Sequence, residues 1–222
     1  MREIVFDTET TGLDPCEGHR IIEIGAIEVV NRLPTGEQFH CYINPQREVE
    51  ASAVRVHGLT NEKLMGMPVF EDVAAAFRTF VGDSPLVAHN ASFDINFLNY
   101  EYLWANQSAL ANEVIDTLAM AREKFPGSQV SLDALCRRFD VDLSGRTRHG
   151  ALLDAELLAN VYLELTGGQQ PALSLIDEGE QGKDNVSKYK QTKPRPPRNF
   201  DVPPDELKMH QEFVATISGN LW

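Results

Sequence analysis

The chain has 222 residues, of which 42% are hydrophobic and 24% charged, a composition typical of a soluble globular protein with one substantial domain and additional segments. Its formal net charge of −13 argues against nucleic-acid binding through overall charge, because phosphate contacts normally draw on Lys and Arg. Three cysteines without a CxxC pair exclude a disulfide framework and a zinc ribbon, and the lack of a signal-peptide pattern and of a membrane-length apolar run predicts a cytoplasmic protein.

The first 45 residues are expected to form strands. A first strand ends at Asp7, and two more are predicted over 20–30 and 38–45, separated by the turn-rich segment 31–37. Connections this short indicate an antiparallel meander.

Helices are expected to dominate from residue 68 on. In chain order we predict a helix over 68–83, a strand over 85–90, a helix over 91–107, a short strand and helix over 113–125, and helices over 131–141 and 150–168. Strands first, followed by alternating strands and helices, predict an α/β fold with a mixed sheet flanked by helices.

The character of the sequence changes after residue 168. We therefore expect a folded domain over 1–168 and a flexible, Pro-rich and polar linker over 169–202. The segment 203–222 regains a helical pattern of apolar residues, but it is too short to bury that face alone. Together, 169–222 form an extended C-terminal tail.

Two acids in the first strand region, Asp7 and Glu9, are two positions apart. Side chains alternate along a strand, so both point to one face. Like charges held together raise each other's pKa unless a cation intervenes, and hard cations such as Mg²⁺ prefer carboxylate oxygens. A solvated strand end beside a turn explains a lone Asp-x-Glu equally well.

Three more candidates lie downstream. Asp94, in "HNASFD", falls in the first turn of a predicted helix, where an acid is also favoured as a capping-region residue. His149 and Asp154, in "RHGALLDAE", are ~140° apart on an ideal helix, so they do not share a face. Both can serve one site if His149 lies in the loop before the helix, although a histidine at a helix start is also a common surface residue.

The order, spacing and flanking residues of these pieces carry more information than each piece alone. "FDTETTGL", "HNASFD" and "HGALLDA" resemble the three motifs of the DEDDh exonuclease family. "EGHRIIEIGAIEVVNR", "VHGL" and "SLDALCRRF" resemble, within that family, the proofreading epsilon subunits of bacterial DNA polymerase III, over nearly all of residues 1–170. The resemblance implies a ribonuclease-H-like mixed sheet and hydrolysis of the 3′-terminal phosphodiester to release nucleoside 5′-monophosphates.

The resemblance also assigns roles. It makes Asp7, Glu9, Asp94 and Asp154 the ligands of two Mg²⁺ or Mn²⁺ ions, and His149 the general base. Two ions ~3.5–4 Å apart can activate the attacking water and stabilise the leaving 3′-oxygen. A neutral imidazole, with an unperturbed pKa near 6.5, is suited to removing a proton from that water. Asp7 is expected to bridge the ions, with Asp94 on the second one.

Substrate contacts are expected beside these ligands. Asp7, Glu9 and Asp154 are predicted to contact the substrate, and Thr10 and Gly12 are expected to line the pocket of the terminal nucleotide. His57, in "VHGL", matches a substrate-contacting histidine of the family, although a polar residue in a turn before glycine explains it equally well. Ser52 stands where the family usually has glutamate, which leaves one nucleotide contact open.

The tail is expected to hold partner contacts. In "QPALSL", the residues Gln170, Leu173 and Leu175 resemble the peptide that docks on the sliding clamp (beta), although a plain linker can contain the same residues. The segment 203–221 occupies the place of the element that anchors epsilon to the polymerase III catalytic (alpha) subunit. The basic run 188–198 can meet DNA, meet an acidic surface, or form a solvated linker.

The sequence thus predicts a metal-dependent 3′–5′ DNA exonuclease that proofreads by acting on the single-stranded 3′ end of primer DNA. Two alternatives remain: an exoribonuclease of the same superfamily, and a non-catalytic clamp or polymerase adaptor on a nuclease fold. Mg²⁺-dependent release of nucleotides from 3′-mismatched DNA, compared with RNA, distinguishes the three.

Overall fold

The computed structural model describes residues 1–145, 149–168 and 203–215. The chain divides into two compact units, Met1–Ser174 and Leu175–Trp222. The predicted linker, 169–202, lies outside the described residues, so its expected character stays a prediction.

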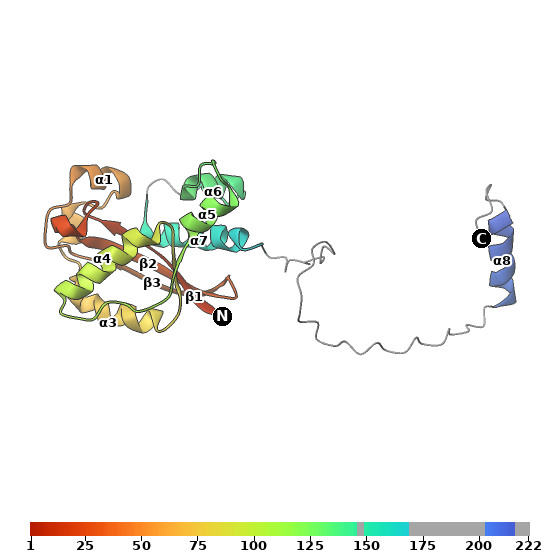
Figure 1. Ribbon diagram of the computed structural model, residues 1–222, viewed down its shortest axis with the longest axis horizontal. Helices are drawn as coiled ribbons and strands as arrows, with labels where there is room; N and C mark the ends of the chain where they lie inside the picture. Colours follow the sequence, from red (N-terminus) through yellow and green to blue (C-terminus); the bar gives the residue numbers. More distant parts are fainter. Residues whose placement is uncertain (146–148, 169–202, 216–222) are drawn as a thin grey trace, which may run out of the picture. The chain divides into compact units, whose positions relative to one another are not determined.

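A five-stranded mixed sheet forms the centre of the first unit, as predicted (Figure 1). Its strands are β1 (Arg2–Thr10), β2 (Ile21–Val30), β3 (Leu33–Tyr42), β4 (Leu86–Ala88) and β5 (Val114–Asp116), in the order β3-β2-β1-β4-β5. The first three strands form the expected antiparallel meander, and β4 and β5 run parallel to β1. Strand β1 therefore lies at the centre of the sheet.

Two strand boundaries differ from prediction. Strand β1 does not end at Asp7 but runs to Thr10, so both acids lie inside the strand, paired with β2 and beyond the residues that pair with β4. The turn between β2 and β3 consists only of Asn31 and Arg32, with φ of 52° and 67°, the left-handed geometry of a tight two-residue hairpin. Most of the segment predicted as a turn belongs to β3, an edge strand that tolerates Pro34.

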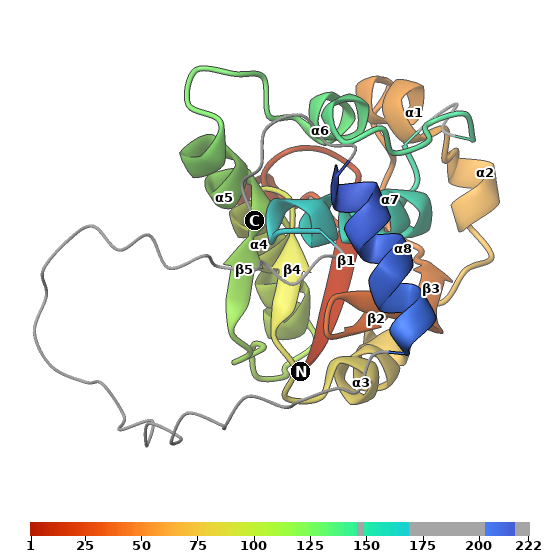
Figure 2. The ribbon, with the colours of Figure 1, turned by 90° about the vertical axis from the view of Figure 1, so that its right-hand side faces the viewer.

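Helices cover both faces of the sheet. They are α1 (Ala51–His57), α2 (Asn61–Leu64), α3 (Phe70–Val81), α4 (Ala91–Trp104), α5 (Thr117–Lys124), α6 (Leu132–Arg138) and α7 (Ala151–Leu165), with a 3₁₀ turn η1 (Pro15–Glu17). Residues of α3 and α4 pack on Ile4 and Phe6 of β1, whereas residues of α7 pack on Val5 from the other side. Figure 2 shows α7 in front of β1 and α4 behind the sheet. Alternate side chains of β1 thus point to opposite faces of the sheet, where they meet different helices.

Most predicted helices are present, with corrected ends. The helix predicted over 91–107 stops at Trp104, because Asn106 adopts a positive φ of 53° that ends the helical path. The last predicted helix ends before Gly167, as expected. Helices α1 and α2 were not predicted, since seven and four residues are too few to produce a periodic apolar pattern.

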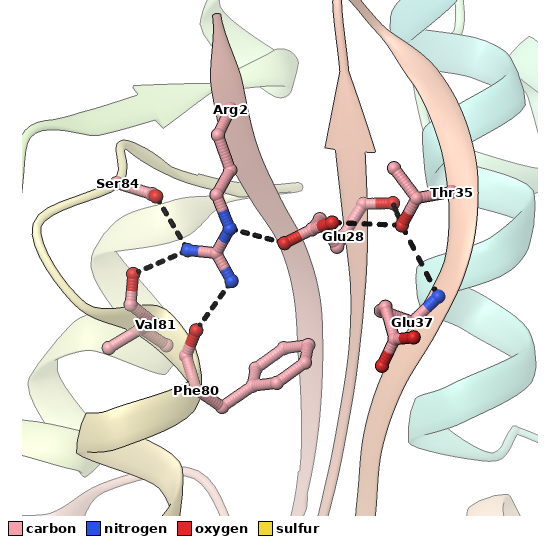
Figure 3. A network of polar contacts seen from close by, with 7 residues as sticks. All are labelled: Arg2, Glu28, Thr35, Glu37, Phe80, Val81 and Ser84. Carbon is pink, nitrogen blue, oxygen red and sulfur yellow. Dashed lines mark hydrogen bonds and ion pairs between the residues drawn. The ribbon is translucent and has the colours of Figure 1, made fainter.

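A polar network fixes the beginning of β1 (Figure 3). The guanidinium of Arg2 pairs with Glu28 of β2 and donates hydrogen bonds to the carbonyls of Phe80 (2.7 Å) and Val81 (3.1 Å) and to Ser84 Oγ (2.7 Å). One side chain therefore ties β1 to its neighbouring strand and to the end of α3, and so sets the position of the strand that carries Asp7 and Glu9.

The described part of the second unit is α8 (Pro204–Ala215), within the segment predicted as helical. Its apolar side chains Leu207, Met209 and Phe213 are 48%, 63% and 65% exposed. The residues after Ala215 lie outside the described part. No helix in the described parts of the chain has the length and apolar character needed to cross a membrane.

Candidate active site

The two acids of β1 face α7. Val5, two residues before Asp7, packs against Leu158 and Ala159 of α7, and alternation along the strand places Asp7 and Glu9 on the same face. Asp7 and Glu9 therefore lie on one face of β1, as expected from their spacing. Glu9 is only 8% exposed, so its carboxylate is largely removed from water.

The start of α7 brings the downstream residues to these acids. Gly150 is the N-cap residue with an extended φ of −156°, so His149 lies in the loop and Asp154 in the first helical turn. With His149 in the loop before the helix, His149 and Asp154 can both contribute to one site. His149 Nδ1 lies 3.1 Å from Asp154 Oδ2, a hydrogen bond between an exposed imidazole and a buried carboxylate.

Glu9, His149 and Asp154 form a group with the spacing of metal ligands. One ligand atom from each lies within 4.8 Å of the others. Glu9 and Asp154 are 8% and 3% exposed, and a cation between two carboxylates at this range offsets their mutual repulsion. The oxygen-rich donor set fits a hard divalent cation. Asp7 and Asp94, the other predicted ligands, are not members of this group in the described part of the chain.

Asp94 reaches β1 from the opposite side of the sheet. It lies in the first turn of α4, and its Oδ1 accepts hydrogen bonds from Thr8 N (3.1 Å) and Thr8 Oγ1 (2.6 Å). Burial raises the pKa of Asp94 to about 7; the bonds from Thr8 oppose this rise, and the charge of Asp116 adds to it. Thr8 stands between Asp7 and Glu9, so Asp94 is coupled directly to the strand that bears the other acids.

A pocket of about 390 Å³ opens beside the ligand group. Its walls include four residues that the sequence assigned to substrate or metal: Glu9, Thr10, Gly12 and His57. It is also lined by Thr8, Leu13, Glu17, His19, Glu50, Ser52, Ala53, Val56 and Phe93. Asp7 and Asp154, also expected to touch the substrate, are not among the lining residues.

His57 presents a buried donor at this pocket. It is the last residue of α1 and is 6% exposed. Its Nδ1 accepts the backbone N–H of Leu59 at 3.0 Å, so the ring proton lies on Nε2. Burial, and then the nearby His149, lower the pKa of His57, which keeps the ring neutral. Nε2 is buried and lacks a hydrogen-bond partner among the described residues.

Sequence reasoning missed a second histidine of the pocket. His19 is 5% exposed, with Nδ1 3.1 Å from Thr11 Oγ1 and Nε2 3.6 Å from a carboxylate oxygen of Glu50. Ser52 Oγ in turn donates to Glu50 at 3.2 Å. The signal available in the sequence was the segment "EGHRIIEIG", whose histidine was not singled out.

Some predicted contacts cannot be placed. Gln170, Leu173 and Leu175, and the basic run 188–198, lie outside the described residues. Their assignment to the clamp and to other partners remains a prediction from the sequence.

Comparison with known proteins identifies close relatives. The exonuclease family model, RNase T type, matches residues 4–162. The DNA polymerase III subunit epsilon of Rickettsia felis is 48% identical, with 98% of this chain and 97% of the relative covered. The protein of the same name from Haemophilus influenzae is 43% identical, with 100% and 94% covered.

Solved structures share the fold. Exonuclease X in complex with 5′ overhanging duplex DNA superposes with a TM-score of 0.58 at 26% identity, covering 74% of this chain and 90% of that one. The nuclease domain of 3′hExo, a DEDDh family member bound to rAMP, superposes with a TM-score of 0.63 at 18% identity, covering 74% and 91%. The sheet order, the helices on both faces and the extent of sequence identity lead to one assignment: this chain belongs to the exonuclease family, together with the DNA polymerase III epsilon subunits of these bacteria.

Proposed function

We propose that this exonuclease removes nucleotides from the 3′ end of DNA and proofreads for a replicative polymerase. One observation carries the proposal: Glu9 is at once a member of the ligand group with His149 and Asp154 and a wall of the 390 Å³ pocket. A terminal nucleotide in that pocket has its phosphodiester beside the ligand group, which is the arrangement that hydrolysis requires.

Carboxylates would hold the metal. Glu9 and Asp154, with Asp7 on the same strand face, would hold one Mg²⁺ or Mn²⁺ ion, and Asp94 would hold the second. Bound ions supply a more acidic water and stabilise the leaving 3′-oxygen. Asp94 must lose its proton to act as a ligand, and a nearby divalent charge lowers its raised pKa.

His149 acts as the general base. Asp154 accepts the proton of Nδ1, which orients the imidazole and directs the other nitrogen, Nε2, to proton transfer. The exposed position of the ring, 48% of the side chain, gives the attacking water and the substrate access to it. The attacking water would lose its proton to Nε2 as its oxygen bonds to phosphorus and the bond from phosphorus to the 3′-oxygen breaks. The 3′-oxygen then takes a proton from solvent, and a nucleoside 5′-monophosphate is released.

The pocket binds the unpaired terminal nucleotide. His57 Nε2–H is a buried donor on its wall, and a substrate oxygen satisfies it. Thr10 and Gly12 line the same wall. An unpaired 3′ end enters at lower cost than a matched one, because a matched end must first be separated from its template.

Partners are proposed from the relatives' names and from the tail. The exposed apolar residues of α8 suit an amphipathic helix that binds a groove of the polymerase catalytic (alpha) subunit. The segment 170–175 is the proposed contact for the sliding clamp (beta), and cytoplasmic location follows from this role. Tethering raises the local concentration of the primer end, which compensates for the weak DNA attraction of a chain with net charge −13.

The test is nucleotide release from 3′-mismatched primer–template DNA, from matched DNA and from RNA, with Mg²⁺ and with chelator. We expect metal-dependent release of 5′-monophosphates, fastest from the mismatched DNA. Preference for RNA would support the exoribonuclease alternative, and inertness on all substrates would support the adaptor.

A further inference from the structure

Gly25 of β2 lies directly opposite Asp7 of β1 in the antiparallel register, on the sheet face that α7 covers. A Cβ placed on Gly25 would lie 2.1 Å from Leu152 N, 2.2 Å from Ala151 C and 2.3 Å from Leu152 Cα. These are backbone atoms of the first turn of α7, which cannot rotate away as a side chain can. A glycine inside a strand often marks such a close approach of two backbones.

Small side chains form one line on the face of α7 that meets the sheet, beside the larger Leu158 and Tyr162. Ala151, Ala155 and Ala159 recur every four residues on one side of the helix, and each is at most 1% exposed. Ala159 packs with residues of β1 and β2, and Ala151 touches Gly25. Side chains without bulk along this line let α7 lie close to the strands.

The close approach matters because the ligand group spans this interface. Glu9 comes from β1, whereas His149 and Asp154 come from the start of α7, and their ligand atoms lie within 4.8 Å of one another. Mg²⁺ would bind these side chains only at short distances with little tolerance, so widening the group would weaken metal binding. To relieve the contact at Gly25, the first turn of α7 would have to move by about 1 Å or more.

We propose that Gly25 is a positioning residue for the metal centre: its missing side chain holds the His149–Asp154 segment at ligand distance from the acids of β1. The inference rests on the proposed function. Gly25, and the α7 residues Ala151 and Leu152 that its added Cβ would meet, are not among the residues that line the pocket. Gly25 therefore affects metal binding and turnover more than binding of the 3′ end.

The test measures Mn²⁺ affinity of the full chain without DNA, by electron paramagnetic resonance, for wild type, Gly25→Ala and Gly66→Ala. Gly66 is the matched control, because a Cβ there meets no atom within 4 Å. We expect the Mn²⁺ dissociation constant to rise at least tenfold in Gly25→Ala and to stay within twofold in Gly66→Ala. At saturating metal, kcat should fall at least tenfold in Gly25→Ala, while KM for a single-stranded 3′ end changes less than threefold.

A second pair of variants covers the case in which Gly25→Ala does not fold. Ala155→Val adds two methyl groups to α7 next to Asp154. Ala159→Val adds the same two methyl groups one turn further along α7 and is its control. The inference requires weaker Mn²⁺ binding in Ala155→Val than in Ala159→Val. Equal affinities in this pair, or wild-type affinity in a folded Gly25→Ala chain, would overturn it. Absence of Mn²⁺ binding by the wild type would instead overturn the proposed metal centre itself.

Discussion

At the scale of single residues, His149 shows how one hydrogen bond can define a chemical role. Its Nδ1 contacts Asp154 Oδ2 at 3.1 Å, although the two residues are too far apart around an ideal helix to meet. The contact exists because α7 begins at Ala151, which leaves His149 in the loop. The sequence could predict this condition but not the distance, since the loop's path depends on where the helix docks.

Replacing His149 by alanine should lower kcat by about 10²–10⁴-fold, the range that a positioned general base contributes. DNA binding should persist, because the pocket walls do not include His149. Single-turnover release from 3′-mismatched DNA and fluorescence anisotropy measure the two quantities. His40→Ala is the matched control, because His40 also contacts a carboxylate, Glu23 at 2.7 Å, but on β3. Near-normal turnover in His149→Ala would remove this residue from the mechanism.

Asp94 leads to a prediction about pH and stability. Its pKa is about 7 in the folded protein and near 3.9 when unfolded, so between these values the folded state binds more protons. Titration of Asp94 therefore lowers the free energy of unfolding of the metal-free chain as pH rises from about 4 to 7. Asp94→Asn keeps the Oδ1 acceptor for Thr8 without a charge, and should stabilise the metal-free chain at pH 8 by on the order of 2–4 kcal/mol.

Urea unfolding in chelator at pH 4.5 and pH 8 checks this prediction. The stabilising effect of Asp94→Asn should be large at pH 8 and nearly absent at pH 4.5. The exposed Asp142 is the control: bonds from Ser144 lower its pKa, so Asp142→Asn should not stabilise the chain at pH 8. An effect of Asp94→Asn that is equal at both pH values would contradict the raised pKa.

At the scale of elements, the sequence predicted the sheet and the long helices but not the short pieces. The meander follows from strand-like segments joined by short turns, and α3 follows from its apolar periodicity, whereas the direction of β4 was not predicted. Helix α1 forms one wall of the pocket and was not predicted, nor was α2, because one or two helical turns carry too little periodicity. The contacts of Glu50 with Ser52 and His19 were therefore not predicted from the sequence.

The network around Arg2 should stabilise the central strand. Arg2→Ala removes its pairing with Glu28, two hydrogen bonds to carbonyls at the end of α3 and one to Ser84 Oγ, and leaves the two carbonyls with one partner fewer. We expect a drop in Tm of a few °C, measured by scanning calorimetry. Arg47→Ala, which removes a single exposed bond to the carbonyl of Glu17, should change Tm by less. Equal changes in the two variants would show that the network adds no particular stability.

At the scale of the whole molecule, the chain combines a folded exonuclease unit with a C-terminal unit described only as α8. The change of composition after residue 168 predicts a domain boundary there, because polar and Pro-rich sequence buries few apolar side chains; the linker expected over 169–202 lies outside the described residues. Composition cannot predict what the tail binds, since short apolar motifs gain their meaning from a partner.

Removal of residues 200–222 should separate catalysis from assembly. The truncated chain retains every predicted metal ligand, so release of nucleotides from single-stranded DNA should stay within about twofold of the full chain. Co-purification with the polymerase catalytic subunit should be lost, because the exposed apolar side chains of α8 are removed. Full retention of the polymerase subunit would refute α8 as the anchor.

The central claim is that Glu9 and Asp154 hold a divalent cation beside a pocket for the terminal nucleotide. Anomalous diffraction from crystals soaked with Mn²⁺ and a deoxynucleoside 5′-monophosphate tests it directly. We predict an anomalous peak within ~2.0–2.4 Å of carboxylate oxygens of both residues, with the nucleotide's phosphate on the ion and His57 Nε2 bonded to the nucleotide. A nucleotide bound in the pocket with no ion at Glu9 and Asp154, or ions bound only elsewhere, would contradict the account.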